Sequence, residues 1–238
     1  MTWSIIAFDP AAGSFGVAVA SRALAIGGRM PHVRAGVGAV ATQSISNAYL
    51  GPRVLDLIAA GMAPSAAIKE ALDADGGREL RQLHAVDRHG RCAAWTGRHC
   101  VEWAGEACGE GVSVAGNMLA NERVAKATLA GFVAAPGRLG ERLVAALEAG
   151  DAVGGDRRGR QAAVLLVATA EDFPEINLRV DDHAAPLAEL RRLLALYREQ
   201  LEPNAAIYPS KTNPSGMTDL DAIEARWRDR GLKLRFRR

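Results

Sequence analysis

The sequence is poor in cysteine and in aromatic residues, and both shortages exclude classes of site. Its 238 residues include three cysteines, Cys92, Cys100 and Cys108, without a Cys-x-x-Cys pair. Their odd number and their spacing argue against a disulfide framework and against the usual zinc motifs, so we expect no metal site. Aromatic residues make up 5% of the chain. This composition favours close-packed layers of small residues over the aromatic stacking platforms of proteins that bind single-stranded nucleic acid.

The sequence also lacks an excess of one charge and a long apolar run. Lys and Arg number 29 against 27 for Asp and Glu, which gives a net charge of +2. This balance predicts neither a nucleic-acid partner nor a membrane-surface partner. No apolar run reaches the roughly 18 residues that a membrane span needs. Asp9 and Pro10 interrupt the first apolar stretch, which argues against a signal peptide, so we expect a cytoplasmic protein.

The residue patterns predict an α+β fold with strands and helices in separate blocks. Alternating apolar residues and turn residues predict strands at 2–8, 15–21, 37–42, 82–86, 92–96, 112–115, 161–169 and 176–180. Apolar spacing of three and four predicts helices at 49–60, from Pro64 to Leu72, and at 122–134, 139–149 and 187–201. Hairpins around Asp9-Pro10 and around Asp87-Arg88-His89-Gly90 favour antiparallel sheets covered by helices over a doubly wound parallel fold.

The sequence predicts two parts, a main domain at 1–201 and a C-terminal appendage at 202–238. The appendage has a proline-rich connector, an amphipathic helix at about 219–230 and a basic tail. Leu220, Ile223 and Trp227 share one face of that helix. We expect this face to contact a second subunit, which predicts a homo-oligomer.

Thr2 is the first candidate catalytic residue. It follows Met1, and a second residue this small permits removal of the methionine, which would leave threonine at the start of a buried strand. A free N-terminal threonine joins a hydroxyl nucleophile to an α-amine with a pKa of about 7.7–8.0, which can act as its base. The alternative is that Thr2 is simply a β-branched residue at the start of a strand.

The first two predicted strands are similar to those of a known enzyme class. The chain reads Thr-Trp-Ser-Ile-Ile-Ala-Phe from Thr2 and Gly-Val-Ala-Val-Ala-Ser-Arg-Ala from Gly16. This resembles the start of the proteasome-type N-terminal-nucleophile (Ntn) hydrolases. The resemblance implies a four-layer αββα sandwich and amide hydrolysis by Thr2, with Ser21 in a matching position. Ala20 stands where those enzymes carry a catalytic Asp.

Those enzymes also carry a lysine on the next strand, and this chain has no lysine counterpart there. Arg34 is the nearest cationic candidate. An arginine can hold an anion or lower the pKa of the amine, but it stays charged and cannot act as a base. The alternative for Arg34 is a surface salt bridge.

Segments farther along the chain resemble one family. They are 35–43, Asn47 with Gly51-Pro52-Arg53, 116–119, 154–161 and 178–183. Together they look like the bacterial and archaeal family DUF1028, and the resemblance covers about residues 2–200. It implies an Ntn-hydrolase-like fold without an assigned reaction.

A glycine-rich loop at 154–161 is a candidate binding site. Arg157, Arg158 and Arg160 surround Asp156 just before an apolar strand. Arginines in such a loop can bind a carboxylate or phosphate in a bidentate manner, while glycines let the backbone approach the ligand. The alternative is an ion-pair knot at the entry of the strand.

Amide and hydroxyl side chains at the ends of two predicted strands are further candidates. Gln43, Ser44 and Asn47 lie between a strand and the first helix, and Asn117 follows Gly116 at the end of another strand. Donors here can grip a substrate amide or stabilise an oxyanion. Asn47 can equally cap the helix. We expect His84 and the other histidines of that region to be structural or exposed.

The sequence therefore predicts an amidohydrolase that acts on a small amide or a short peptide and needs no cofactor. Thr2 would be the nucleophile, Asn117 or the segment 43–47 would stabilise the oxyanion, and Arg34 or the loop 154–161 would bind an anionic group. Two other functions stay open. The protein can be a non-catalytic ligand-binding or scaffold protein on the same fold, or a hydrolase that uses Ser21, Ser44 or a metal.

Overall fold

The computed structural model describes residues 2–237, which divide into two compact units. One unit ends at Leu194 and the other begins at Ala195, whereas the sequence predicts a boundary after Leu201. Met1, whose removal is predicted above, and Arg238 at the end of the basic tail lie outside the described residues.

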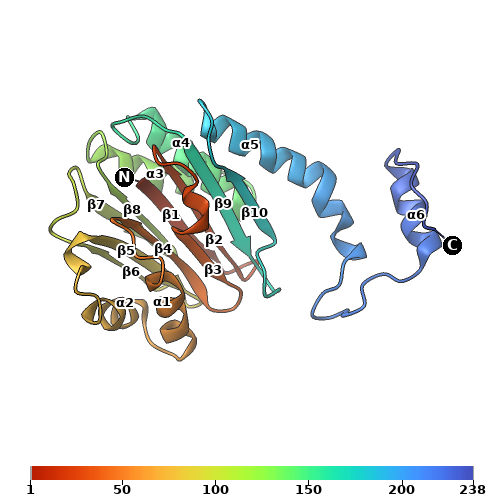
Figure 1. The fold of residues 1–238 in the computed structure, drawn as a ribbon, viewed down its shortest axis with the longest axis horizontal. Coiled ribbons are helices and arrows are strands. Elements are labelled where there is room, and N and C mark those ends of the chain that lie inside the picture. Colours follow the sequence, from red (N-terminus) through yellow and green to blue (C-terminus); the bar gives the residue numbers. More distant parts are fainter. Residues whose placement is uncertain (1, 238) are drawn as a thin grey trace. The chain divides into compact units, whose positions relative to one another are not determined.

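The first unit contains a six-stranded antiparallel sheet, here called sheet A. Its strand order is β10-β9-β2-β1-β8-β7. The strands are β1 (Thr2–Asp9), β2 (Ser14–Ser21), β7 (Gly105–Gly109), β8 (Val112–Asn117), β9 (Ala162–Ala168) and β10 (Ile176–Val180). The first strand of the chain therefore lies in the centre of the sheet, between β2 and β8 (Figure 1).

A second antiparallel sheet, sheet B, packs against sheet A. It contains β3 (Pro31–Arg34), β4 (Gly38–Ser44), β5 (Arg81–Asp87) and β6 (Cys92–Thr96) in this order. Ile6, Val17 and Val19 of sheet A form one apolar cluster with Ala41 and Val86 of sheet B. Small residues such as Ala41 let the two sheets approach closely, and this cluster fills part of the space between them.

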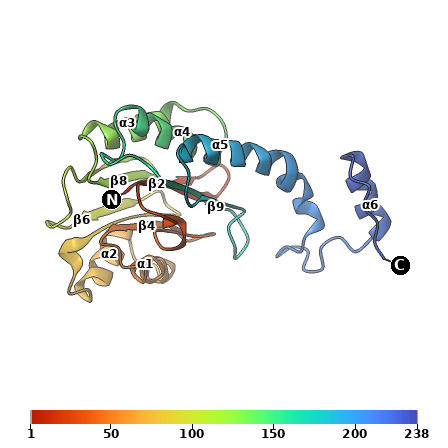
Figure 2. The same cartoon turned by 45° about the horizontal axis from the view of Figure 1, so that its top comes forward.

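Helices cover the outer face of each sheet (Figure 2). Helices α1 (Leu50–Ala59) and α2 (Pro64–Asp73) pack on sheet B, and helices α3 (Arg123–Ala134) and α4 (Leu139–Ala152) pack on sheet A. Each helix turns an apolar stripe inward, as Val54, Leu55 and Ile58 of α1 show by their burial. The predicted α+β class with mainly antiparallel sheets is confirmed.

The structure corrects three details of the predicted elements. Strands β3 and β7 were not predicted, because β3 begins with a proline and β7 reads Gly-Glu-Ala-Cys-Gly. Both are edge strands, where prolines and weak strand formers are tolerated. The helix predicted at 187–201 is α5 (Pro186–Leu196), which is followed by a π-helical turn at Tyr197–Leu201. None of the helices in the described part is long and apolar enough to cross a membrane.

The second unit carries helix α6 (Leu220–Asp229). Its Ile223 is buried, and the Trp227 ring packs on Phe236 of the tail with 5.0 Å between the ring centroids. The Glu224 carboxylate accepts a hydrogen bond from the Phe236 backbone N–H. Part of the stripe that predicts a subunit contact is therefore covered by the chain's own tail, and the homo-oligomer stays a prediction.

Candidate functional site

The alternation of β1 points Thr2 into the space between the two sheets. Ser4, two residues farther along, hydrogen-bonds to side chains of sheet B, so Thr2 and Ser4 face that sheet. Trp3 points the other way, toward α4, where an added Cβ on Gly150 would lie 3.1 Å from the indole nitrogen. The same Cβ would lie 2.1 Å from Thr128 Oγ1, so Gly150 leaves room for both the threonine and the indole. This anchor fixes the start of β1 and with it the direction of Thr2.

The Thr2 hydroxyl lies against Ser21 and opposite Asn117. Its oxygen is 3.2 Å from Ser21 Oγ and 3.5 Å from Met30 Sδ. Ser21 Oγ also accepts the Ala23 backbone N–H at 3.1 Å. Thr2 and Asn117 are paired in the register of β1 and β8, and their exposed fractions are 0% and 1%. Within residues 2–237, no charged side chain hydrogen-bonds to Thr2.

Gln82 of sheet B connects this region across the gap between the sheets. Its Oε1 accepts the Asn117 amide at 2.9 Å and the Gln43 amide at 2.8 Å. Its own amide donates to the Gly116 carbonyl at 2.8 Å. Buried amides hold their orientation when most of their donors and acceptors are used, as here. Gln82 therefore fixes the Asn117 side chain beside Thr2.

A second part of the network runs through His84. Its Nε2 is 2.8 Å from Ser4 Oγ, and its Nδ1 is 3.1 Å from Ser113 Oγ. Ser4 donates its single hydroxyl proton to Gln43 Oε1 at 2.7 Å. We therefore assign the His84 proton to Nε2, so that Ser4 accepts from His84 and Ser113 donates to Nδ1. Burial lowers the pKa of His84 to about 3, against the opposing effect of a hydrogen bond to the Ser113 backbone, so the ring is neutral near pH 7.

Sequence reasoning missed Ser4, Gln82 and Ser113 and took His84 only as structural or exposed. The sequence does carry a signal for them. Ser4 comes two residues after Thr2, and His84 comes two residues after Gln82, within strands that are otherwise apolar. Polar residues at alternate positions share one face of a strand, so each pair points into the same layer.

The loop at 154–161 lies at the same end of sheet A as Thr2. Its Asp156 is buried and bridges to Leu119, and the Arg157 N–H donates to the Met118 carbonyl, one residue after Asn117. The Asp156 carboxylate accepts the backbone N–H of Arg22, the residue after Ser21, at 3.0 Å. This carboxylate ties the loop to the end of β2.

The three arginines of the loop have different environments. Arg158 pairs with Asp156 at 3.1 Å, and Arg160 pairs with Asp151 at 3.1 Å. These two belong to an ion-pair knot at the entry of β9, which was the alternative for this loop. The Arg157 side chain is exposed and has no hydrogen bond or ion pair in the part of the chain that the structure describes. Arg157 is therefore the arginine that can accept an anionic ligand.

Backbone strain gathers at this end of the two sheets. Among the described residues, the non-glycine positions with positive φ are Ala25 at 53°, Ser44 at 69° and Met118 at 51°. Ser44 is the last residue of β4, Met118 directly follows β8, and Ala25 comes four residues after the end of β2. Such conformations cost about 1–3 kcal/mol each and are often retained where a site needs them.

Two other predicted residues lie elsewhere. Arg34 sits opposite Gly38 at the far end of sheet B, and its guanidinium pairs with Asp56 of α1 at 2.8 Å. Arg34 therefore forms a surface salt bridge, and it lies at the end of sheet B away from Thr2. Asn47 accepts the Tyr49 backbone N–H near the start of α1 and donates to Asp75. Asn47 therefore stabilises the local turn but does not cap the helix, because the N-cap position of α1 is Tyr49 and no side chain caps it.

Gln43 and Ser44 separate because successive side chains of a strand point to opposite faces. Gln43 is buried between the sheets, and Ser44 is half-buried at the end of β4.

Near Asn47, hydrogen bonds from Arg81 lower the pKa of Asp75 to about 2. Among the described residues, His, Cys, Asp and Glu side chains form no group of three or more that could hold a metal ion.

Most of the chain matches the model of one protein family. A family model with the description "Family of unknown function (DUF1028)" matches residues 2–190. The chain belongs to DUF1028. A DUF1028 protein from Silicibacter pomeroyi has 30% sequence identity to this chain and a TM-score of 0.85, over 92% of this chain and 96% of that one.

A second solved structure is much less similar to this DUF1028 chain. Anbu (ancestral beta-subunit) from Yersinia bercovieri has 13% identity and a TM-score of 0.39, over 84% of this chain and 98% of that one. A TM-score of this size supports no conclusion about this chain. No curated protein shows significant similarity to the sequence.

Proposed function

We propose that this DUF1028 protein is an Ntn-type hydrolase that cleaves an amide bond in a small molecule or a short peptide, with Thr2 as its nucleophile. The observation that carries the proposal is the position of the Thr2 hydroxyl, which starts the central strand, lies 3.2 Å from Ser21 Oγ and faces Asn117. A helix pair packs on the outer face of each sheet, which supports the αββα sandwich that the sequence resemblance implies.

The mechanism begins with removal of the residue that precedes Thr2. The freed α-amine takes the hydroxyl proton while the Thr2 oxygen attacks the substrate carbonyl. The tetrahedral intermediate collapses when the amine returns that proton to the leaving nitrogen, which leaves an ester on Thr2. Water then attacks the ester, again with the amine as base, and releases the acid and the free threonine.

The Ser21 hydroxyl and the Asn117 amide each have a role in this mechanism. Ser21 orients the Thr2 hydroxyl, because the two oxygens are already in contact. One N–H of the Asn117 amide donates to Gln82, and its second N–H has no partner within residues 2–237. We assign this second N–H to the developing oxyanion, where a fixed donor lowers the barrier by a few kcal/mol. The Gln82 bond keeps the donor fixed.

Arg157 favours a substrate with an anionic group. Its backbone N–H binds the Met118 carbonyl, so its Cα lies near the end of β8 that carries Asn117. Its guanidinium has no carboxylate partner among the residues described, unlike those of Arg158 and Arg160. A substrate carboxylate bound there would gain a charge-assisted hydrogen bond that contributes about 1.5–3 kcal/mol.

The experiment uses the mass of the N-terminal peptide and a β-lactone probe, which acylates a reactive hydroxyl. We expect the purified protein to begin at Thr2 and to gain one probe mass on the peptide that contains Thr2. The Thr2→Ser variant should keep the adduct, and Thr2→Ala should lose it. Ser21→Ala should slow acylation by about tenfold or more, because the hydroxyl loses its orientation. The matched control is Ser44→Ala, another serine at this end.

Three outcomes would refute this mechanism. An N-terminus that retains Met1 in protein from its native host leaves no free Thr2 amine. An adduct on Ser21 or Ser44 in place of Thr2 would support a hydrolase with an internal serine. Protein that begins at Thr2 and forms no adduct would support a ligand-binding protein on the same fold.

A further inference from the structure

A cavity lies at the end of sheet B opposite to Thr2. It has a volume of about 220 Å³. Three segments form it: the turn between β3 and β4 with Val37, the end of α1 with Ile58 and Ala59, and the β5–β6 hairpin from Asp87 to Arg91. In the register of sheet B, Gly38 pairs with Asp87 at this end and Ser44 pairs with Arg81 at the other. The cavity is therefore separate from the candidate active site.

Asp87 makes the hairpin side of the cavity rigid. Its side chain is 1% exposed, and one carboxylate oxygen accepts the backbone N–H groups of His89 and Arg91, each at 2.9 Å. The other oxygen binds the Arg91 guanidinium, 2.7 Å from Nε and 2.6 Å from its second nitrogen. Every oxygen of Asp87 is thus engaged with the hairpin itself. The carboxylate fixes Arg91 and neutralises its charge.

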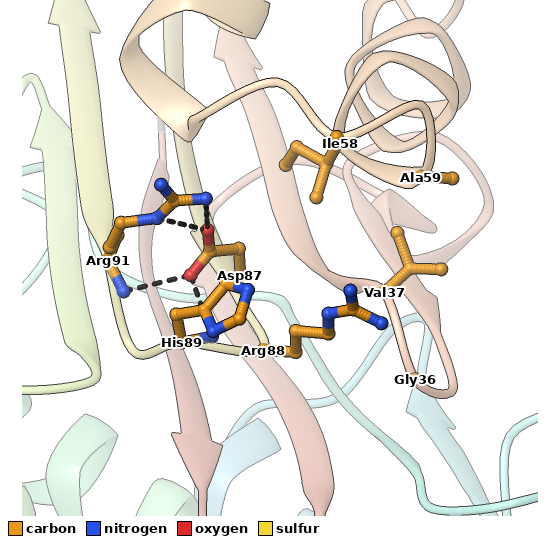
Figure 3. Close-up of a pocket in the computed structure, with 9 residues that line it drawn as sticks. Gly36, Val37, Ile58, Ala59, Asp87, Arg88, His89 and Arg91 are labelled. Atoms are coloured by element: carbon orange, nitrogen blue, oxygen red, sulfur yellow. Dashed lines mark hydrogen bonds and ion pairs between the residues drawn. The ribbon is translucent and has the colours of Figure 1, made fainter.

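Arg88 adds a further positive charge to the lining of the cavity. Within residues 2–237 its side chain has no hydrogen bond and no ion pair, and the same holds for the His89 ring. Figure 3 shows Arg88 extending from the hairpin toward Val37, with Ile58 above the same space. With Arg91 balanced by Asp87, the lining carries one net positive charge beside an apolar wall made by Val37 and Ile58.

We propose that this cavity binds a small organic carboxylate, with the carboxylate on Arg88 and a short apolar group against Val37 and Ile58. A guanidinium presents paired N–H donors that match the two oxygens of a carboxylate. The apolar wall adds affinity for a hydrocarbon group that an inorganic anion lacks. The volume suits a ligand smaller than the drug-sized molecules that fill pockets of about 300–1,000 Å³. The proposal does not depend on Thr2 or on hydrolysis.

The test follows backbone amide signals by NMR while the full-length protein is titrated with isovalerate, isovaleramide and inorganic phosphate. Isovalerate should shift the amide signals of residues 36–38 and 87–91 in a saturable manner. Isovaleramide has nearly the same shape without the charge, and it should bind at least about tenfold more weakly. Phosphate lacks the apolar group and should also bind more weakly than isovalerate.

Two variants and one control separate this site from general anion binding. Arg88→Gln should weaken isovalerate binding by about tenfold or more, and Arg88→Lys should recover only part of it. Val37→Phe keeps every charge but adds bulk to the wall that Arg88 extends toward, and it should weaken binding as well. Arg29→Gln removes another exposed arginine, one without an ion pair among the described residues, and should leave the shifts of residues 36–38 and 87–91 unchanged. Equal binding of isovaleramide, or unchanged binding in Arg88→Gln, would overturn the proposal.

Discussion

Acidification from pH 7 to pH 5 is expected to destabilise the protein through His84. Burial lowers the pKa of this histidine from 6.5 to about 3 in the folded protein, whereas the unfolded chain keeps the ordinary value. Between these two pKa values the unfolded state binds a proton that the folded state refuses. The free energy of unfolding therefore falls as the pH drops below about 6.5, and the loss continues down to about pH 3.

The size of the effect follows from the two pKa values. At pH 5 the unfolded histidine is almost fully protonated and the buried one is neutral, so the loss is about 2 kcal/mol. For a typical stability of about 5–15 kcal/mol, this loss is easily measured. Asp75, with a pKa of about 2, adds a loss of the same sign that becomes important only below about pH 4. The window from pH 7 to pH 5 therefore excludes the loss that comes from Asp75.

The assay is urea unfolding at half-unit steps from pH 7 to pH 5. Burial also lowers the pKa of His32, so both arms use a His32→Gln background, and the comparison is His84 against His84→Gln. The parent should lose about 2 kcal/mol more than the His84→Gln variant over this window. Equal losses in the two proteins would refute the assignment of a neutral buried His84, whatever the stability of the variant at pH 7.

Three further changes test the packing of the two sheets and of the loop beside Thr2. Asp156→Ala removes a buried carboxylate that accepts two backbone N–H groups. It should lower the free energy of unfolding in denaturant by about 2 kcal/mol or more. Arg158→Gln, at the exposed end of the same ion pair, should lower it by less than about 1 kcal/mol. Gly38→Ala places a Cβ 2.4 Å from a backbone carbonyl oxygen of β5 and should lower the free energy of unfolding by about 1–3 kcal/mol. Its control is Gly76→Ala, where the new Cβ has open space around it and stability should change by less than about 0.5 kcal/mol. Gln82→Leu should lower the melting temperature and broaden the Asn117 side-chain amide signals by NMR, because that amide loses its acceptor.

Local features of the sequence determined most of the elements. The alternation in Thr2–Asp9 and Ser14–Ser21, with a turn between them, predicted the first hairpin, and the apolar stripe before Ala60 predicted α1. These signals are local because a strand or a helix exposes its buried face through its own periodicity. Edge strands such as β3 have weaker local signals, because they bury less of their surface, and the sequence did not reveal them.

The candidate site was determined only in part by the sequence. The start of the chain singled out Thr2, and the family pattern added Asn117 and Ser21, but the roles of these residues in a reaction stay predictions. Tertiary structure decided the surroundings of Thr2. It moved Arg34 to a surface pair with Asp56 and turned Asn47 to the start of α1.

The polar layer between the sheets could not be predicted from any segment by itself. Ser4 and His84 are 80 positions apart in the chain, and Gln82 and Asn117 are 35 apart. The alternation of each strand determines which of these side chains face inward. Which inward-facing groups meet depends on how the two sheets are stacked and in what register, and that is fixed by the packing of the whole unit. The sequence therefore determined which side chains of each strand face inward, and only the tertiary structure decided which of these side chains hydrogen-bond to each other.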